Sequence, residues 1–147
     1  MKKITLILLC NLFIINLFSQ NTDYFQQETN YKINVSLDDK THVLSGDISI
    51  EYHNNSPKAL TEIWMHLWGN AYKNQRSEFA KQQLRSGKKR FFFSKDTDKG
   101  KFDAINFQVN GSNATWEFDK NNPDIAVIRL AKPLESGDKL TISTPFT

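Results

Sequence analysis

Hydrophobic and polar residues alternate through most of residues 29–53. The hydrophobic positions are Tyr31, Ile33, Val35 and Leu37, followed by Leu44, Ile48, Ile50 and Tyr52. Because successive side chains of a strand point to opposite faces, this pattern predicts two strands, near 29–37 and 42–53, each with one face in water. The polar run 38–41 (DDKT) predicts the turn that joins them as an antiparallel hairpin.

Five further strands are predicted, near 60–67, 103–109, 113–119, 125–130 and 139–144. In the strand at 60–67 both faces carry bulky side chains, so we expect a central strand that is covered on both sides. Asn110-Gly111 favours a two-residue hairpin turn, because both residues tolerate positive φ. Another turn is expected at 121–124, and a loop at 132–138.

Residues 69–101 interrupt the β pattern. Phe79, Ala80 and Leu84 recur at helical spacing and predict a helix over 75–85, with Ser77 as its N-cap and Gly87 as its terminator. The run 91–93 (FFF) predicts a buried strand or an anchor under this excursion. The predicted fold class is all-β: an antiparallel β-sandwich or a saddle-like curved sheet with one short helix in an inter-strand excursion.

The first twenty residues have the pattern of a secretory signal peptide. Lys2 and Lys3 precede an apolar run that starts at Ile4, and Ser19-Gln20 is the candidate cleavage site. Two alternatives stay open, an uncleaved anchor and a lipid-modified Cys10. We expect an exported chain, located in the periplasm, at the cell surface or outside the cell, whose β domain spans 21–147 and which has no stable membrane insertion after cleavage.

Removal of the signal peptide changes the chemistry of the chain. Cys10 is the only cysteine, so the mature chain would have no disulfide and no thiolate metal site. The net charge of +3 would fall to +1, because Lys2 and Lys3 leave and 17 basic residues then face 16 acidic ones. This balance indicates neither a nucleic-acid nor a membrane partner.

Seven basic residues surround the predicted helix and precede the run 91–93. They are Lys73, Arg76, Lys81, Arg85, Lys88, Lys89 and Arg90, and Glu78 offsets them. The cluster is typical of a solvated helix face, which is the interpretation that we favour. The other interpretation is a surface for nucleic acid or another anionic partner.

Two groups of polar residues suggest chemistry. Glu51 and His53 share a strand face with Asp47, which predicts either a metal site or a solvated strand edge; we favour the edge. His66, between Trp64 and Trp68 on the same strand, is either a base in an aromatic pocket or a packed, hydrogen-bonded histidine; we favour the latter.

Paired aspartates occupy two predicted loops. They are Asp38, Asp39, Asp96 and Asp98, and their surroundings lack the glycine and the terminal glutamate of a calcium loop. They therefore indicate turns. We expect no catalytic, cofactor-binding or metal-binding residue in this chain.

Several motifs follow one another in a specific order. T-H-x-L-x-G lies at 41–46, N-N-S-P at 54–57 and H-L-W-x-N-A at 66–71, with a weaker match at 130–146 (LAKPLESGDKLTISTPF). In order and spacing they resemble the N-terminal domain of the aminopeptidase N-like zinc metallopeptidases, the gluzincin family, and most closely its secreted bacterial branch.

This resemblance implies a saddle-like β domain beside a thermolysin-like catalytic domain. That catalytic domain would hold Zn²⁺ through H-E-x-x-H and a later glutamate, and the first glutamate would be the general base. His42, His53 and His66 are the only histidines of this chain and none precedes a glutamate, so no catalytic or zinc-binding residue is carried over.

The resemblance predicts a chain truncated at its C-terminal end. Its partner would be a catalytic domain of the same polypeptide, and the parent protein would remove N-terminal residues from peptide substrates. The alternative is a free-standing secreted β-sandwich that binds a protein or a glycan through Trp64, Trp68 and Trp116.

Overall fold

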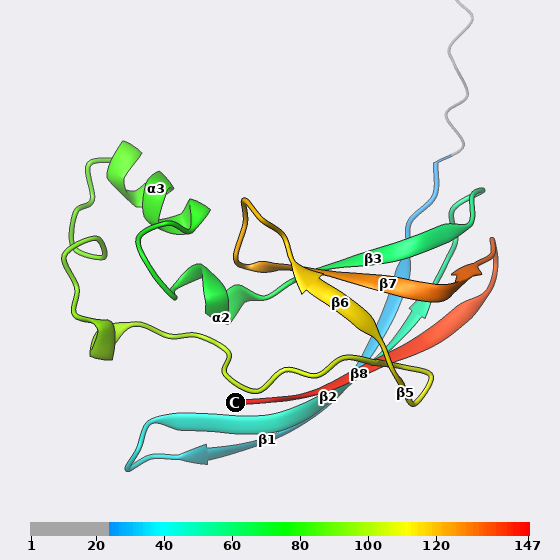
Figure 1. Cartoon of the computed structure of the whole chain (residues 1–147), viewed down its shortest axis with the longest axis horizontal. Helices are drawn as coiled ribbons and strands as arrows, with labels where there is room; N and C mark the ends of the chain where they lie inside the picture. The colour runs from blue at the N-terminus through cyan, green and yellow to red at the C-terminus, as the bar shows by residue number, and fades with distance from the viewer. Residues whose placement is uncertain (1–23) are drawn as a thin grey trace, which may run out of the picture.

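A computed structural model describes residues 24–147 of the protein (Figure 1). Its strands are β1 (Glu28–Asp38), β2 (Val43–His53), β3 (Leu60–His66), β4 (Gln108–Val109), β5 (Ser112–Asn113), β6 (Thr115–Phe118), β7 (Ile125–Leu134) and β8 (Lys139–Phe146). The all-β class predicted from the sequence is confirmed. The predicted signal peptide, with Lys2, Lys3, Cys10 and Ser19, lies outside the described residues.

The strands form two antiparallel sheets of unequal width. The larger sheet has the order β1-β2-β8-β4-β5, and the smaller has the order β3-β7-β6. Ala114 alone separates β5 from β6, so the chain passes from one sheet to the other there. The sheets are therefore joined on the β5–β6 side, whereas β1 and β3 are free edges of their sheets (Figure 1).

The hydrophobic core lies where the smaller sheet covers the larger one. Ile50 and Ile142 of the larger sheet and Ile63 and Ile128 of the smaller sheet are all buried in this cluster. Phe107 is fully buried, and its ring packs edge to face against Trp116, with 5.1 Å between the ring centroids. Burial of these aromatic and branched side chains is the main stabilising contribution in the described chain.

The β1–β2 hairpin agrees with the sequence pattern in its register but differs from it in burial. Tyr31 pairs with Ile50 and Ile33 with Ile48, so the hydrophobic residues of both strands share one face. On β1, however, this face is exposed: Tyr31 by 61%, Ile33 by 53%, Val35 by 59% and Leu37 by 66%. The three-stranded sheet is too narrow to cover it, so the prediction of one wet face per strand is wrong for β1.

The turn of this hairpin depends on one carboxylate. Asp38 accepts hydrogen bonds from the main-chain N–H groups of Lys40 at 2.9 Å and Thr41 at 3.3 Å. Hydrogen bonds from the Thr41 side chain and from these two main-chain groups lower the pKa of Asp38. The expected turn at 38–41 is therefore present, and no metal is needed to explain its acidic residue.

β3 occupies a different position from the expected one. It pairs only with β7 and is an edge strand of the smaller sheet. Ile63 is buried against the core, but Trp64 on the opposite face is 57% exposed. The prediction of a central strand covered on both sides is wrong, because bulky residues alone do not establish that a second layer exists.

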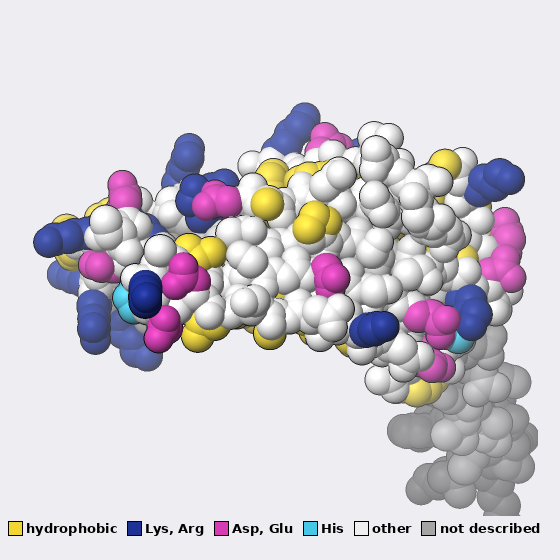
Figure 2. All heavy atoms as spheres, turned by 90° about the horizontal axis from the view of Figure 1, so that it is seen from below, with side chains coloured by type: hydrophobic (Ala, Val, Ile, Leu, Met, Phe, Trp, Pro, Cys, Tyr) yellow, Lys and Arg dark blue, Asp and Glu magenta, His cyan; other side chains and the backbone are white. Residues whose placement is uncertain are grey.

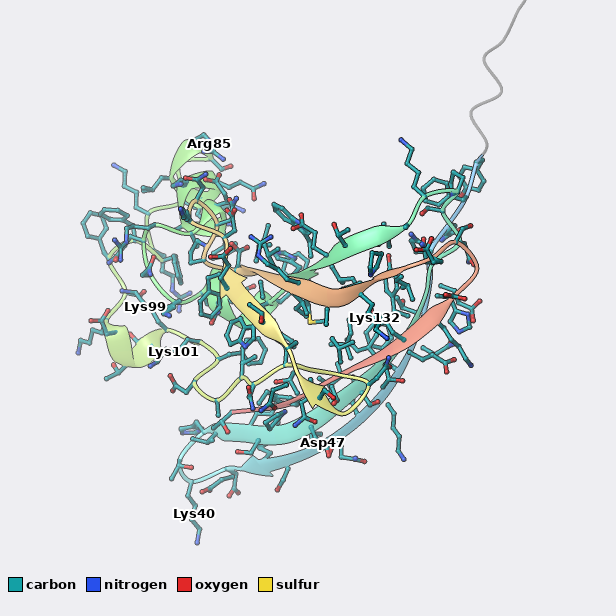
Figure 3. The ribbon with its side chains drawn as sticks, turned by 45° about the vertical axis from the view of Figure 1, so that its right-hand side comes forward. Lys40, Asp47, Arg85, Lys99, Lys101 and Lys132 are labelled. Atoms are coloured by element: carbon teal, nitrogen blue, oxygen red, sulfur yellow. The ribbon has the colours of Figure 1, made fainter. Side chains whose placement is uncertain are left out.

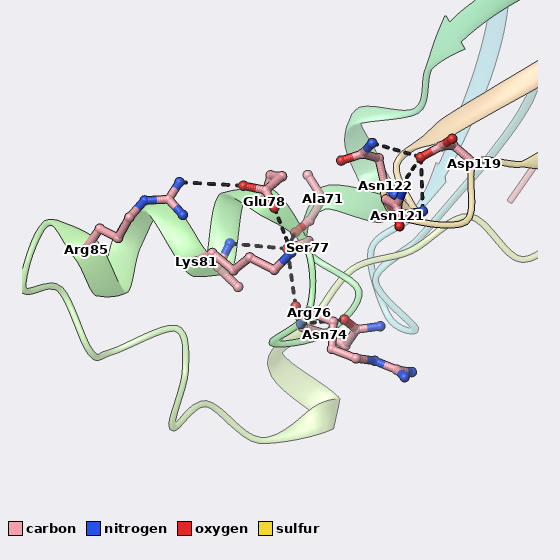
Figure 4. A network of polar contacts seen from close by, with 11 residues as sticks. Ala71, Asn74, Arg76, Ser77, Glu78, Lys81, Arg85, Asp119, Asn121 and Asn122 are labelled. Carbon is pink, nitrogen blue, oxygen red and sulfur yellow. Dashed lines mark hydrogen bonds and ion pairs between the residues drawn. The ribbon is translucent and has the colours of Figure 1, made fainter.

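The predicted helix is confirmed as α3 (Glu78–Arg85) (Figure 4). The Ser77 hydroxyl accepts a hydrogen bond from the main-chain N–H of Ala80 and donates one to the carbonyl of Ala71. Ser77 thereby caps α3 and attaches it to a second short helix, α2 (Trp68–Ala71), which the sequence pattern did not predict. Gly87 follows the helix with φ +75°, as expected of a terminator.

The rest of the excursion differs from the predictions. Residues 91–93 form turns instead of a strand; Phe91 packs on Phe79, with 5.1 Å between centroids, and Phe93 is exposed. A short 3-10 helix, η2 (Asp96–Asp98), follows. The strand expected at 103–109 is limited to β4, and β7 extends to Leu134, so that part of the expected loop at 132–138 is strand. The hairpin at Asn110-Gly111 is confirmed by positive φ at both residues.

Replacement of Gly46 by alanine is expected to destabilise the fold. A Cβ atom there would lie 2.1 Å from the Asn34 carbonyl oxygen and 2.8 Å from the Phe146 ring. We expect Gly46→Ala to lower the free energy of unfolding by about 1–3 kcal/mol in urea titrations. Gly100→Ala is the matched control, because nothing lies within 4 Å of its added Cβ; equal stability of the two variants would contradict this account.

Candidate functional site

An apolar groove of about 530 Å³ lies between the β1–β2 hairpin and β3. Its floor is the apolar face of the hairpin, including Tyr31, Ile33 and Ile48, and Phe102 and Phe146 line it as well. None of its lining residues is Asp, Glu, Lys or Arg. Such a surface matches an apolar, uncharged partner.

One wall of the groove is the edge of β3 and not one of its faces. Residues 63–66 of β3 line the groove consecutively, whereas a strand that presented a face would contribute every second residue; Leu67 and Trp68 continue the wall beyond the strand. The Leu67 N–H donates to the Asp124 carbonyl at 2.7 Å, toward β7. By the alternation of an antiparallel pair, the main-chain N–H and C=O groups of Trp64 and His66 therefore point away from β7, along the free edge.

His66 lies at the end of this wall. Its Nε2 is 2.8 Å from Oδ2 of Asp124, and its ring packs on Trp68 with 4.1 Å between centroids. Asp124 is nearly buried, and its Oδ1 has no hydrogen-bond partner among residues 24–147. The predicted hydrogen-bonded histidine is confirmed, but its side chain is 39% exposed and so the expected covering is absent. The contact with Asp124 and the packing on Trp68 hold the imidazole in one orientation at the rim of the groove.

The residues of the possible metal site on β2 make two separate sets of contacts. His53 Nε2 lies 3.0 Å from Glu51 Oε1, and Lys139 Nζ lies 3.0 Å from Glu51 Oε2; the contacts with His53 and Lys139 lower the pKa of Glu51. Asp47 instead accepts a hydrogen bond from the Asn34 amide at 2.8 Å, on the polar outer side of the hairpin (Figure 3). Among the described residues, no group of three or more His, Cys, Asp or Glu side chains is placed to hold a metal ion.

The aspartates expected in turns act there as short-range acceptors. Asp96 pairs with Lys99 at 2.8 Å, and this contact lowers the pKa of Asp96. Asp119, which the sequence analysis did not single out, accepts hydrogen bonds from the main chain of Asn121 and Asn122 and from the Asn122 amide (Figure 4). Each of these contacts closes a local turn.

The three tryptophans do not form one binding surface. Trp64 and Trp68 are 57% and 69% exposed beside the groove. Trp116 is half-buried between Phe107 and Phe118 and belongs to the core. Only Trp64 and Trp68 are therefore available for the protein- or glycan-binding surface that was expected to include all three tryptophans.

The basic cluster lies on and after α3. Glu78 pairs with Lys81 at 2.7 Å and with Arg85 at 3.5 Å, and these contacts lower its pKa, the Lys81 hydrogen bond most. Lys88, Lys89 and Arg90 are exposed. Figure 2 shows basic side chains gathered toward the end of the molecule that carries α3, with acidic ones interspersed.

No helix within residues 24–147 is long and apolar enough to cross a membrane.

The motif residue Asn54 is a buried connector. Its amide nitrogen donates to the carbonyl oxygens of Lys58 at 2.9 Å, Leu134 at 2.9 Å and Glu135 at 3.1 Å, and its amide oxygen accepts from Ser56. Its own main chain bonds to Gly137 and Asp138. The sequence analysis noted Asn54 only as part of the N-N-S-P motif at 54–57 and predicted no connecting role for it.

The motif residue Asn70 makes an equivalent connection at the other end of the fold. Its side-chain oxygen accepts from the Phe102 N–H at 2.9 Å, and its amide nitrogen donates to the Pro123 carbonyl at 3.3 Å. Asn70 is fully buried, and Leu67 and Ala71 of the same motif are buried as well. Asn70 thus fixes the backbone beside the groove without lining it, whereas His66, Leu67 and Trp68 of the same motif line the groove.

Loss of the Asn54 side chain is expected to destabilise the protein strongly. Asn54→Ala leaves buried carbonyl groups without a donor, so we expect the free energy of unfolding to fall by about 2–4 kcal/mol in urea titrations. Asn121→Ala is the matched control, because the Asn121 side chain is exposed and bonds to no described residue. A loss below about 0.5 kcal/mol for Asn54→Ala, within the range of surface changes, would contradict the connector role.

Comparison with known proteins adds no relative to this description. No protein-family model matches the chain, and neither a curated protein nor a solved structure matches it. The family resemblance therefore rests on the sequence motifs alone.

Proposed function

We propose that this chain is the non-catalytic N-terminal β domain of a zinc aminopeptidase-like metallopeptidase. In this proposal a catalytic domain of the same polypeptide binds Zn²⁺ and removes N-terminal residues from peptides. The β domain supplies scaffold and one wall of the substrate cleft. The order of the three sequence motifs is the reason for naming this family.

The observation that carries the proposal is the uncovered apolar face of β1 and β2. Four hydrophobic residues of β1 are more than half exposed on one face, and the groove beside them has no Asp, Glu, Lys or Arg in its lining. Proteins that act alone rarely leave a contiguous apolar face of this kind in water. A domain that packs against another part of its protein has a reason to keep it.

The positions of the motif residues support the same proposal. Asn54 and Asn70 satisfy buried main-chain groups, and Gly46 lets the Phe146 ring and the Asn34 carbonyl of β1 approach β2. Because these residues support the backbone, the resemblance that they carry concerns the structure of the domain. It is therefore consistent with a domain whose contribution to the enzyme is structural.

The second candidate is a secreted β-sandwich that binds a protein or a glycan. The exposure of Trp64 and Trp68 beside the groove favours it, since exposed aromatic side chains are common at binding sites. The core position of Trp116 weighs against the surface that it would need. The two candidates differ in whether the chain folds and stays monomeric by itself.

The coding DNA downstream of Thr147 tests the proposal directly. We expect an open frame that continues to H-E-x-x-H and a later glutamate. A stop codon without such a frame would overturn the proposal and favour the binding module. Purified residues 21–147 should also leave an aminoacyl-anilide uncleaved, and chelator-sensitive hydrolysis by this chain alone would contradict the assignment of catalysis to another domain.

The isolated chain is expected to self-associate through the β1 face. We expect the double variant Ile33→Thr, Val35→Thr to associate less. Its weight-average sedimentation coefficient and its binding of a hydrophobic dye should both be lower than those of the unchanged chain. Because both side chains are more than half exposed and threonine suits strands, stability should change by less than about 1 kcal/mol.

The matched control for this experiment is Ile142→Thr. Ile142 is 1% exposed in the core of the same sheet, so its replacement should cost about 2–4 kcal/mol of stability. Unchanged association in the double variant would show that another surface is responsible.

A further inference from the structure

We infer that the groove receives an extended polypeptide strand, which pairs with the free edge of β3 and buries its alternate side chains on the β1–β2 face. This strand would be a fourth member of the smaller sheet. The inference rests on the proposed function, because the strand is assigned to a part of the parent polypeptide outside residues 24–147. It goes beyond that function by naming how the partner binds.

The first argument is the hydrogen-bonding capacity of β3. The main-chain N–H and C=O groups of Trp64 and His66 point along the free edge, because Leu67 bonds to Asp124 on the other side. Unpaired edges of this kind are templates for another strand. Only a polypeptide backbone offers donors and acceptors at the matching spacing, so the occupant is an extended peptide segment and not a compact ligand.

The second argument is the position of the apolar face relative to that edge. Tyr31, Ile33 and Ile48 line the same groove as residues 63–68 of the β3 wall. A strand added about 4.8 Å beyond β3 would lie over the hairpin, as a packed sheet does at about 10 Å. Its alternate side chains would then cover Tyr31 and Ile33, two of the residues that the three-stranded sheet leaves exposed.

The third argument is charge. No groove residue is Asp, Glu, Lys or Arg, so a charged side chain pointing inward would be desolvated without a partner. The complementary occupant is a strand with uncharged, branched residues at alternate positions. This excludes the basic segment 88–90 of a second copy as the occupant, since three consecutive cations cannot avoid facing the floor.

Binding of a synthetic strand tests the inference. The probe is a capped nine-residue peptide of alternating valine and threonine with a lysine at each end, titrated into residues 21–147. We expect saturable binding by calorimetry and slowed hydrogen exchange at the Trp64 and His66 amides. Failure to bind, or equal binding by an all-threonine peptide, would overturn the inference.

A pair of variants at one position separates edge pairing from contact with the side chain. Trp64→Ala removes the side chain but keeps the edge N–H, so it is the reference against which the loss of the N–H is measured. Trp64→Pro removes that N–H, is tolerated at strand edges, and should weaken binding by at least about tenfold. Equal binding by the two variants, at matched thermal unfolding midpoints, would overturn the edge pairing.

Three further outcomes distinguish this inference from the alternatives. A dimer whose formation the peptide does not inhibit, and whose Trp64 and His66 amides are already protected, would assign the groove to a second copy and overturn the inference. A downstream frame with H-E-x-x-H but no strand binding would overturn the inference alone. Strand binding without that frame would overturn the proposed function and leave the groove as a peptide site.

Discussion

The mismatch in width between the two sheets determines most of this structure. A sheet of three strands lies over a sheet of five, and the two are joined at β5 and β6. The core therefore forms on the joined side, around Phe107 and Trp116, where both layers are present. On the other side the hairpin extends beyond its cover. The groove, the exposed face of β1 and the free edge of β3 are three consequences of this one constraint.

Buried amides hold the uneven layers in place. Residues 24–147 contain no cysteine, so packing and hydrogen bonds alone connect their loops. Asn54 fastens the end of β2 to the turn between β7 and β8, and Asn70 fastens α2 to residues 102 and 123. Each amide offers donors and an acceptor in a fixed plane. Asparagine is therefore suited to joining main-chain groups that are not hydrogen-bonded within a helix or a sheet.

Local features of the fold were predictable from the sequence. The hairpin register follows from the alternation at 31–37 and 48–52, and the Ser77 cap and the turn at Asn110-Gly111 follow from the conformational preferences of single residues. These features depend on neighbours in the chain. The hydrogen-bonded state of His66 was also anticipated, although its partner, Asp124, lies 58 residues away and was not.

Features that depend on the coverage of a face were not predictable. Alternation at Tyr31 to Leu37 indicates that one face is apolar, but it does not say whether a second layer reaches that face. The same limit explains β3, where bulky residues suggested two covered faces, and the segment 91–93, where Phe91 packs on Phe79 but Phe92 and Phe93 are exposed. The groove itself arises from the relative width of two sheets, a quantity that no local pattern contains.

The position of β8 has a consequence for how the chain folds. This strand lies between β2 and β4, and its residue Phe146 pairs with Gly46, a hundred residues earlier in the chain. The β1–β2 hairpin closes locally, whereas the sheet that contains it is completed only when β8, about a hundred residues later in the chain, has been synthesised. Contacts of such long range slow folding, and the apolar hairpin remains in solvent meanwhile. The apolar hairpin can therefore aggregate during the interval before β8 pairs with β2. Chaperone binding to the hairpin would matter most in that interval.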